Sequence, residues 1–282
     1  MRLRQLEKSL MRRLGSLGAE ARPVTRLIVE HFTGRNALYV SLHPDEESGQ
    51  EAETAAFEAA AGVEKGVPVQ YLLHEAWFYG RPFYVDGRVL IPRPETEELV
   101  HWLLSCHTVA GGLRVADWCT GSGCIAVTLA MERPGWSCSG YDAFEPVLQV
   151  ARRNAESLGA EVRWLCRDLL ADSAAADDSC DIIISNPPYV RESERPLMPV
   201  RVTGHEPPAA LFVPDGDPLL FYRALAGWGR GALRDGGEIY IEINEALGPE
   251  TAALLRDSGY RDVEIRRDMQ GKERMIKAVF VK

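Results

Sequence analysis

The sequence has little that would suit a membrane or an extended nucleic-acid surface. None of its apolar runs approaches the roughly 20 residues that a membrane-spanning helix needs. The net charge of −9 argues against a long nucleic-acid groove, because neutralising phosphates requires clustered Lys and Arg side chains. We therefore expect no membrane and no direct nucleic-acid contact, and a folded protein or a small molecule as the partner.

Paired cysteines and metal-ligand spacings are missing too. The histidines show no His-Glu-x-x-His or comparable spacing, so we predict no metal site. His74 or His101 could act as a base, but an isolated histidine near apolar residues is more often simply packed. The cysteines form no Cys-x-x-Cys pair, which favours free thiols in a reducing cytoplasm. They stand at Cys106, Cys119, Cys124, Cys138, Cys166 and Cys180.

The N-terminus lacks the unbroken apolar centre of a signal peptide, because Glu7 and several basic residues interrupt it. Leucines recur there at helical spacing, which predicts an amphipathic folded helix and a cytoplasmic protein. These leucines are Leu3, Leu6, Leu10, Leu14 and Leu17.

Residues 1–75 are expected to form a small all-helical domain. The same apolar rhythm returns at 23–32 and 51–63, and the acidic run at 45–47 suits a helix start. We find no chemistry in this segment, so its expected use is to hold a partner.

Residues 76–92 are expected to link two domains through a β-hairpin. Aromatic and β-branched residues surround Asp86-Gly87, which is a hairpin-turn signal. Beyond it, Pro92 to Glu98 predicts a helix start, with proline and carboxylates in the first turn.

Residues 93–282 alternate apolar strands with helices, which predicts an α/β fold: a doubly wound, mostly parallel, seven-stranded Rossmann-like sheet. The last two strands are close enough to form an antiparallel hairpin, so we expect an antiparallel edge. The predicted strands are 113–117, 137–141, 162–166, 181–185, 238–243, 261–267 and 274–281. The predicted helices between them are 123–132, 145–157, 217–233 and 249–257.

A glycine-rich loop, Asp117 to Gly123, follows the first of these strands and leads directly into a helix. Glycines there let a ligand approach the backbone over the helix N-terminus. The loop alone could serve a dinucleotide, S-adenosylmethionine or only a tight turn. Asp142 ends the second strand, where a carboxylate can accept hydrogen bonds from ribose hydroxyls, and Asp168 ends the third. Either could merely cap the next helix, but together they predict an adenosine pocket.

The fourth strand ends in Asn186-Pro187-Pro188-Tyr189. Prolines offer no N–H, so carbonyl oxygens at this turn can lack internal partners, and Asn186 adds an amide oxygen beside them. A planar NH2 group would fit, with its hydrogens on Asn186 and the Pro187 carbonyl and with Tyr189 against its plane. The alternative is a simple turn with a tyrosine in the core.

Such a turn suits methyl transfer to an amide or nucleobase nitrogen, whose lone pair is conjugated and poorly nucleophilic. Holding both hydrogens aims the nitrogen and stabilises the positive charge that develops on it, and the proton can leave afterwards. A dinucleotide dehydrogenase has no need for this arrangement.

These motifs, together with Ile91 to Glu97 and Arg267 to Arg274, resemble those of the PrmC (HemK) family over nearly the whole chain. That family comprises class I methyltransferases that modify the glutamine N5 of the Gly-Gly-Gln motif in class 1 peptide chain release factors. The resemblance implies S-adenosylmethionine as cofactor, S-adenosylhomocysteine as product, and a release factor held by the helical domain. We also expect a monomer.

The resemblance also implies roles for individual residues. The loop Cys119, Thr120, Gly121, Ser122 and Gly123 would hold the methionine part of the cofactor, Asp142 the ribose, and Asp168 and Leu169 the adenine. Asn186, Pro187, Pro188 and Tyr189 would hold the glutamine; of these Asn186, Pro187 and Tyr189 would be catalytic, and Asn186 would also contact the cofactor. Relatives often have Gly at position 119 and some have an aromatic residue at 169, so neither a left-handed Cys119 nor stacking on Leu169 is predicted.

Two other functions remain as alternatives. An adenine-N6 methyltransferase acting on nucleic acid would use the same pocket by base flipping, but it needs a basic, aromatic-lined surface. A non-catalytic binding module would keep the fold without the reaction, and the intact Gly121, Gly123, Asp142 and Asn186 argue against it.

Overall fold

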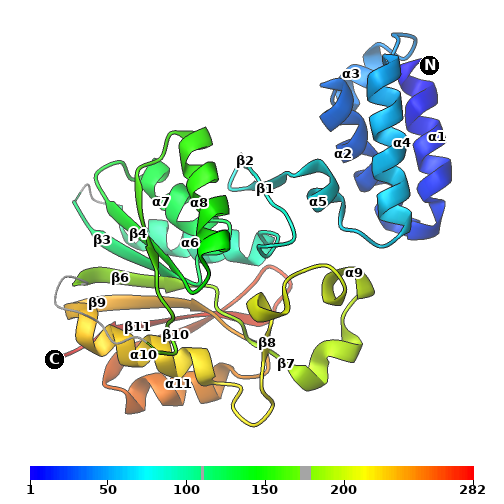
Figure 1. Ribbon diagram of the computed structural model, residues 1–282. Helices are drawn as coiled ribbons and strands as arrows, with labels where there is room; N and C mark the ends of the chain where they lie inside the picture. The colour runs from blue at the N-terminus through cyan, green and yellow to red at the C-terminus, as the bar shows by residue number, and fades with distance from the viewer. Residues whose placement is uncertain (109–110, 172–178) are drawn as a thin grey trace. The chain divides into compact units, whose positions relative to one another are not determined.

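The computed structural model describes residues 1–108, 111–171 and 179–282. The chain forms two compact units (Figure 1). The first contains residues 1–75 and 199–205, and the second contains residues 76–198 and 206–282. No helix within the described ranges is long and apolar enough to cross a membrane.

The first unit is a bundle of short helices around a leucine core. Leu3, Leu6, Leu10 and Leu14 are each at most 1% exposed, as their helical spacing predicts. The first α-helix nevertheless ends before Leu17, because the chain tightens into a 3-10 helix and Gly18 adopts a φ of 59°. The elements are α1 (Leu3–Arg13), η1 (Leu14–Glu20), α2 (Ala21–Thr33), α3 (Ala37–Leu42), α4 (Gln50–Glu64), α5 (Val69–Leu73) and α9 (Val200–Thr203).

The second unit begins with a hairpin whose turn differs from the predicted one. Strands β1 (Ala76–Phe78) and β2 (Arg81–Phe83) pair antiparallel, and Tyr79 and Gly80 between them have φ values of 50° and 75°. Two residues with positive φ match the right-handed twist of paired strands. The hairpin expected around Asp86-Gly87 is therefore wrong, although a turn forms there, in which the Val89 N–H donates to the Asp86 carbonyl at 3.1 Å. That stretch lies outside the strands, where the Asp86 carboxylate accepts hydrogen bonds from Arg88.

The predicted seven-stranded sheet is confirmed, with strand order β10-β11-β9-β6-β3-β4-β5. Within this sheet only β11 runs opposite to the other strands. It pairs antiparallel with β10, the edge strand, and with β9, so the predicted antiparallel hairpin at the edge is confirmed. Ile276 and Ala278 of β11 are fully buried, whereas β10 exposes most of its charged side chains, which suits an edge strand. The strands are β3 (Arg114–Trp118), β4 (Ser137–Asp142), β5 (Val162–Cys166), β6 (Cys180–Ser185), β9 (Leu233–Glu242), β10 (Tyr260–Arg267) and β11 (Glu273–Phe280).

Two hydrophobic cores cover the two faces of this sheet. Ile183 faces the core that includes α10 and α11, and its neighbours Ile182 and Ile184 face the core that includes α6 and α7. Burial on both faces explains the unbroken apolar run Ile182–Ile184 in the middle of β6. The helices are α6 (Pro94–Cys106), α7 (Cys124–Glu132), α8 (Glu145–Leu158), α10 (Leu220–Ala232) and α11 (Gly248–Asp257). Figure 1 shows them packed along the strands.

The short strands and 3-10 helices in the segment between β6 and α10 were not predicted from the sequence. This segment contains the small parallel pair β7 (Val190–Arg191) and β8 (Phe212–Val213) and the 3-10 helices η3 (Glu192–Leu197) and η4 (Pro208–Ala210). Glu206 anchors it to the segment before α6: its buried carboxylate accepts the backbone N–H of Ile91 at 3.1 Å and pairs with Arg93. Leu90, which precedes Ile91, and Pro207, which follows Glu206, line the cavity described next.

Candidate functional site

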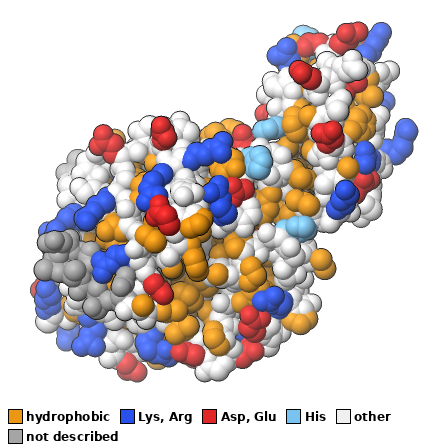
Figure 2. All heavy atoms as spheres, in the orientation of Figure 1, with side chains coloured by type: hydrophobic (Ala, Val, Ile, Leu, Met, Phe, Trp, Pro, Cys, Tyr) orange, Lys and Arg blue, Asp and Glu red, His pale blue; other side chains and the backbone are white. Residues whose placement is uncertain are grey.

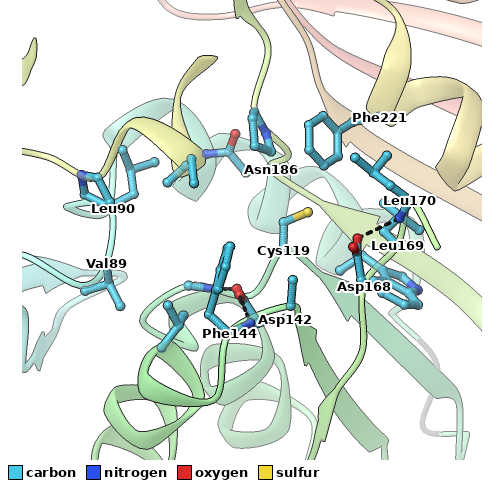
Figure 3. A pocket seen from close by; sticks show the side chains of 18 of the residues that line it. Val89, Leu90, Cys119, Asp142, Phe144, Asp168, Leu169, Leu170, Asn186 and Phe221 are labelled. Atoms are coloured by element: carbon cyan, nitrogen blue, oxygen red, sulfur yellow. Dashed lines mark hydrogen bonds between the residues drawn. The ribbon is translucent and has the colours of Figure 1, made fainter. Parts of the chain in front are cut away.

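A cavity of about 390 Å³ lies at the carboxyl ends of the parallel strands in the second unit. The first parallel strand, β3, has β4 on one side and β6 on the other, so the chain order reverses there. Ligands bind α/β sheets at such switch points. Figure 3 shows the lining side chains converging from the strand ends, from residues 88–90 and from the start of α10.

The glycine-rich loop supplies one wall of the cavity through Cys119 and Gly121. Cys119 adopts a left-handed φ of 58°, which the sequence did not predict for a non-glycine residue. Gly121 and Gly123 also have positive φ, at 55° and 79°. In Figure 3, Cys119 lies between Asn186 and Asp142.

The other loop residues serve the loop itself rather than the cavity wall. A Cβ at Gly123 would lie 2.8 Å from the Trp164 ring, so this glycine permits close packing. Thr120 and Ser122 are buried, and the Thr120 hydroxyl donates to Asp117. Asp117 is fully buried; burial raises its pKa to about 7, against the hydrogen bonds from Thr120 and Ala126.

Asp142 stands at the end of β4, faces the cavity and is tied to the glycine-rich loop. Its Oδ2 accepts the Gly121 N–H at 3.1 Å, and its Oδ1 accepts the Phe144 N–H at 3.2 Å. Burial raises the pKa of Asp142, and the backbone donors act against that increase. The carboxylate is thus held in place with two oxygens that can still accept hydrogen bonds from a ligand.

Asp168 and Leu169 line another wall, where Asp168 Oδ1 accepts the Leu170 N–H at 2.9 Å. The apolar part of the cavity comes mainly from residues that sequence reasoning missed. These are Val89, Leu90, Phe144, Leu170 and Phe221, all labelled in Figure 3. Phe144 and Leu170, which each follow a strand-end acid by two positions, stood near a recognisable signal.

Asn186 reaches the cavity from the end of β6. Its Nδ2 donates to Thr96 Oγ1 at 2.9 Å. Among the described residues, Asn186 Oδ1 and the Pro187 carbonyl accept no hydrogen bond. Pro188 also lines the cavity, whereas Pro187 and Tyr189 do not. The Tyr189 ring packs against the core, and its hydroxyl donates to Glu242 at 2.9 Å.

Comparisons with known proteins agree over most of the chain. The family model described as PrmC N-terminal domain matches residues 4–73, and the one described as Methyltransferase small domain matches residues 99–201. A release factor glutamine methyltransferase of Bacteroides thetaiotaomicron is 44% identical over 216 residues, 77% of each chain. One of Bacillus subtilis is 43% identical over 223 residues, also 77% of each chain. The chain belongs to the release factor glutamine methyltransferase family.

A solved structure agrees on the fold of this family member. A methyltransferase from Pyrococcus furiosus covers 73% of this chain and 91% of its own, with a TM-score of 0.52 and 16% identity. At that identity the likeness concerns the fold alone. It supports the class I methyltransferase fold expected from the alternation of strands and helices.

Two further residues stand behind the cavity of this family member. Thr96 near the start of α6 and Glu242 at the end of β9 are 2% and 1% exposed, and the Thr96 hydroxyl donates to Glu242 at 2.6 Å. Thr96 belongs to the motif that carried the resemblance, but no role followed from its sequence context. Glu242 interrupts the buried run from Ile239 to Ile243, which was the only available signal.

The remaining polar candidates lie elsewhere. His101 is exposed on α6, where it contacts Tyr79 and Ser105 instead of being packed. His74 ends α5 in a left-handed conformation. The described residues contain no group of three or more His, Cys, Asp or Glu suited to a metal ion, and all six cysteines are free.

Proposed function

We propose that this chain transfers a methyl group from S-adenosylmethionine to the side-chain nitrogen of the glutamine in the Gly-Gly-Gln motif of class 1 release factors. One observation carries the proposal: Asn186 Oδ1 and the Pro187 carbonyl have no partner within the described chain, beside a cavity that also exposes Asp142. The names of the relatives support it.

The cavity has the polarity and size for this cofactor. Its volume of about 390 Å³ lies within the usual range for small-molecule sites. Asp142 would accept the ribose hydroxyls, and Phe144, Leu169 and Leu170 would contact the adenine. The left-handed backbone at Cys119 and Gly121 would leave room for the methionine part. Bound there, S-adenosylmethionine supplies an electrophilic methyl group.

The chain's own residues would orient the acceptor. Asn186 Oδ1 and the Pro187 carbonyl accept the two hydrogens of the glutamine NH2 group, which fixes its plane and aims its nitrogen. Both oxygens also stabilise the positive charge that the nitrogen acquires. Tyr189 acts from behind, by donating to Glu242 rather than by covering the amide.

The first unit is proposed to hold the release factor. It matches the PrmC N-terminal domain, and its α3 exposes Leu38 and Leu42, each 68% exposed and one helical turn apart. Replacing both leucines with glutamate should weaken release-factor binding and leave cofactor affinity unchanged. Leu197→Glu, at a position that is 85% exposed, is the control.

The deciding experiment offers purified release factor, DNA and RNA side by side with labelled S-adenosylmethionine. We expect label in the release factor, and mass spectrometry of its peptides should find one methyl group on the Gly-Gly-Gln glutamine. Figure 2 shows Lys and Arg side chains interspersed with Asp and Glu, which does not favour nucleic acid. Label in DNA or RNA alone would refute the proposal, and cofactor binding without turnover would favour a binding module.

A further inference from the structure

The carboxamide of Asn186 can face the cavity with either its oxygen or its NH2 group, and the two orientations recognise opposite ligands. With the oxygen forward, the site accepts hydrogen bonds from an NH2 group. With the NH2 forward, it would instead donate to a carbonyl or carboxylate. The choice between them depends on what holds the other half of the amide.

That half is held by Thr96, whose Oγ1 lies 2.9 Å from Asn186 Nδ2. A threonine hydroxyl has one hydrogen to donate and two lone pairs to accept with. Its hydrogen is already used, because Thr96 donates to Glu242 Oε2 at 2.6 Å. Thr96 can therefore only accept from Asn186, and only the NH2 half of the amide can supply that hydrogen.

Glu242 sets the direction of this chain of hydrogen bonds. Its side chain is almost fully buried and accepts a second hydroxyl hydrogen, from Tyr189, at Oε1. Burial raises the pKa of Glu242, while the Thr96 and Tyr189 donors and the charge of Arg274 act against that increase. With a hydroxyl donor at each oxygen, the carboxylate accepts on both sides.

We propose that Thr96 and Glu242 are positioning residues that keep the Asn186 oxygen toward the cavity and so make the site select a carboxamide NH2 group over a carboxylate. The proposal rests on the function proposed above. Neither residue lines the cavity itself, so both act through Asn186, which does.

Three variants separate the steps of this argument. Thr96→Val keeps the shape of the side chain but removes the hydroxyl, Thr96→Ser keeps the hydroxyl, and Glu242→Gln places an NH2 group where the acceptor stood. In Glu242→Gln the amide can donate to Thr96, whose hydrogen then turns to Asn186 and favours the flipped orientation.

We expect Thr96→Val and Glu242→Gln to lower kcat by roughly tenfold or more, since small misplacements of reacting groups are costly. Cofactor affinity by calorimetry should stay unchanged, and Thr96→Ser should keep near-normal kcat. In an Asn186→Ala background, Thr96→Val should cost nothing further, because its effect passes through Asn186. An equal additional loss in that background would show a merely structural role and overturn the proposal, as would unchanged kcat in both variants.

A spectroscopic measurement tests the orientation without turnover. In ¹⁵N-labelled protein, the Asn186 side-chain NH2 signals are identified by their loss in Asn186→Ala. We expect them to shift in Thr96→Val and to stay in place in Thr96→Ser. If the Asn186 NH2 signals do not shift in Thr96→Val, the positioning role is overturned, whether or not the wild-type protein methylates a release factor. A wild-type protein that methylates no release factor would refute only the proposed function.

Discussion

The backbone N–H of Gly121 donates to Asp142 Oδ2 at 3.1 Å, so the glycine-rich loop and the end of the second parallel strand form one connected wall of the cavity. The same carboxylate accepts the Phe144 N–H through its other oxygen. Loss of the Asp142 side chain should therefore affect both the glycine-rich loop and the binding of a ligand in the cavity.

Asp142→Ala should weaken S-adenosylmethionine binding by about 10- to 100-fold, the value of one or two hydrogen bonds to a charged group. Calorimetry with the wild type and the variant measures the change. Glu145→Gln, at an exposed neighbouring position, is the control and should bind normally. Wild-type affinity in Asp142→Ala would remove the proposed ribose contact.

Asn186→Ala should mainly lower kcat and leave cofactor affinity unchanged, the opposite of what is expected for Asp142→Ala. We expect kcat to fall by about 100- to 1000-fold, as for the loss of a hydrogen-bonding group that stabilises developing charge. Cofactor affinity should remain close to that of the wild type, because Asp142 and the apolar walls are unchanged. Comparable losses in kcat and in cofactor affinity would contradict a role confined to the acceptor amide.

Cys119→Gly should be more stable than Cys119→Ala by about 1 kcal/mol. Position 119 has a φ of 58°, where a side chain costs about 1–2 kcal/mol that glycine avoids, partly offset by glycine's greater freedom in the unfolded chain. Urea unfolding of the two variants measures the difference, and both lack the thiol, so its loss cancels. Equal stability would mean that the backbone relaxes when the sulfur is removed.

Asp117 should make the protein less stable as the pH rises toward neutrality. Burial raises its pKa from 3.8 to about 7, so the folded state retains a proton that the unfolded state releases. The contribution of protonated Asp117 to the free energy of unfolding is fully present below about pH 4. It is lost as the pH rises to about 7, by roughly 4 kcal/mol in total. Urea unfolding at pH 5 and pH 7 tests this.

In Asp117→Asn the difference between the two pH values should shrink, because the amide does not titrate. Exposed Asp257 provides the control, and Asp257→Asn should keep the wild-type difference. The pKa values of Asp142 and Glu242 are raised too and act in the same direction, so we expect the difference to shrink rather than vanish in Asp117→Asn. An unchanged difference in that variant would rule out Asp117 as a source.

Local patterns predicted the sheet and its helices well, because the spacing of apolar residues within each strand or helix indicates which of its faces is buried. The predictions went wrong where distant segments compete. The hairpin turn formed at Tyr79-Gly80 rather than Asp86-Gly87, because Phe78 and Phe83 bury together in the sheet's core. The antiparallel hairpin of the last two strands is confirmed, but the order of the two strands was not predicted: the strand with the buried Ile276 and Ala278, β11, pairs with β9, and the more charged β10 forms the edge.

The sequence by itself determined the fold class, the glycine-rich loop, the strand-end aspartates and the turn at Asn186, because each is written in a few consecutive residues with their own backbone requirements. Only the tertiary structure decided which way the Asn186 amide faces. That orientation depends on Thr96 and Glu242, which lie 146 positions apart in the chain. Hydrogen-bond direction is a property of the assembled group, so no local pattern could have contained it.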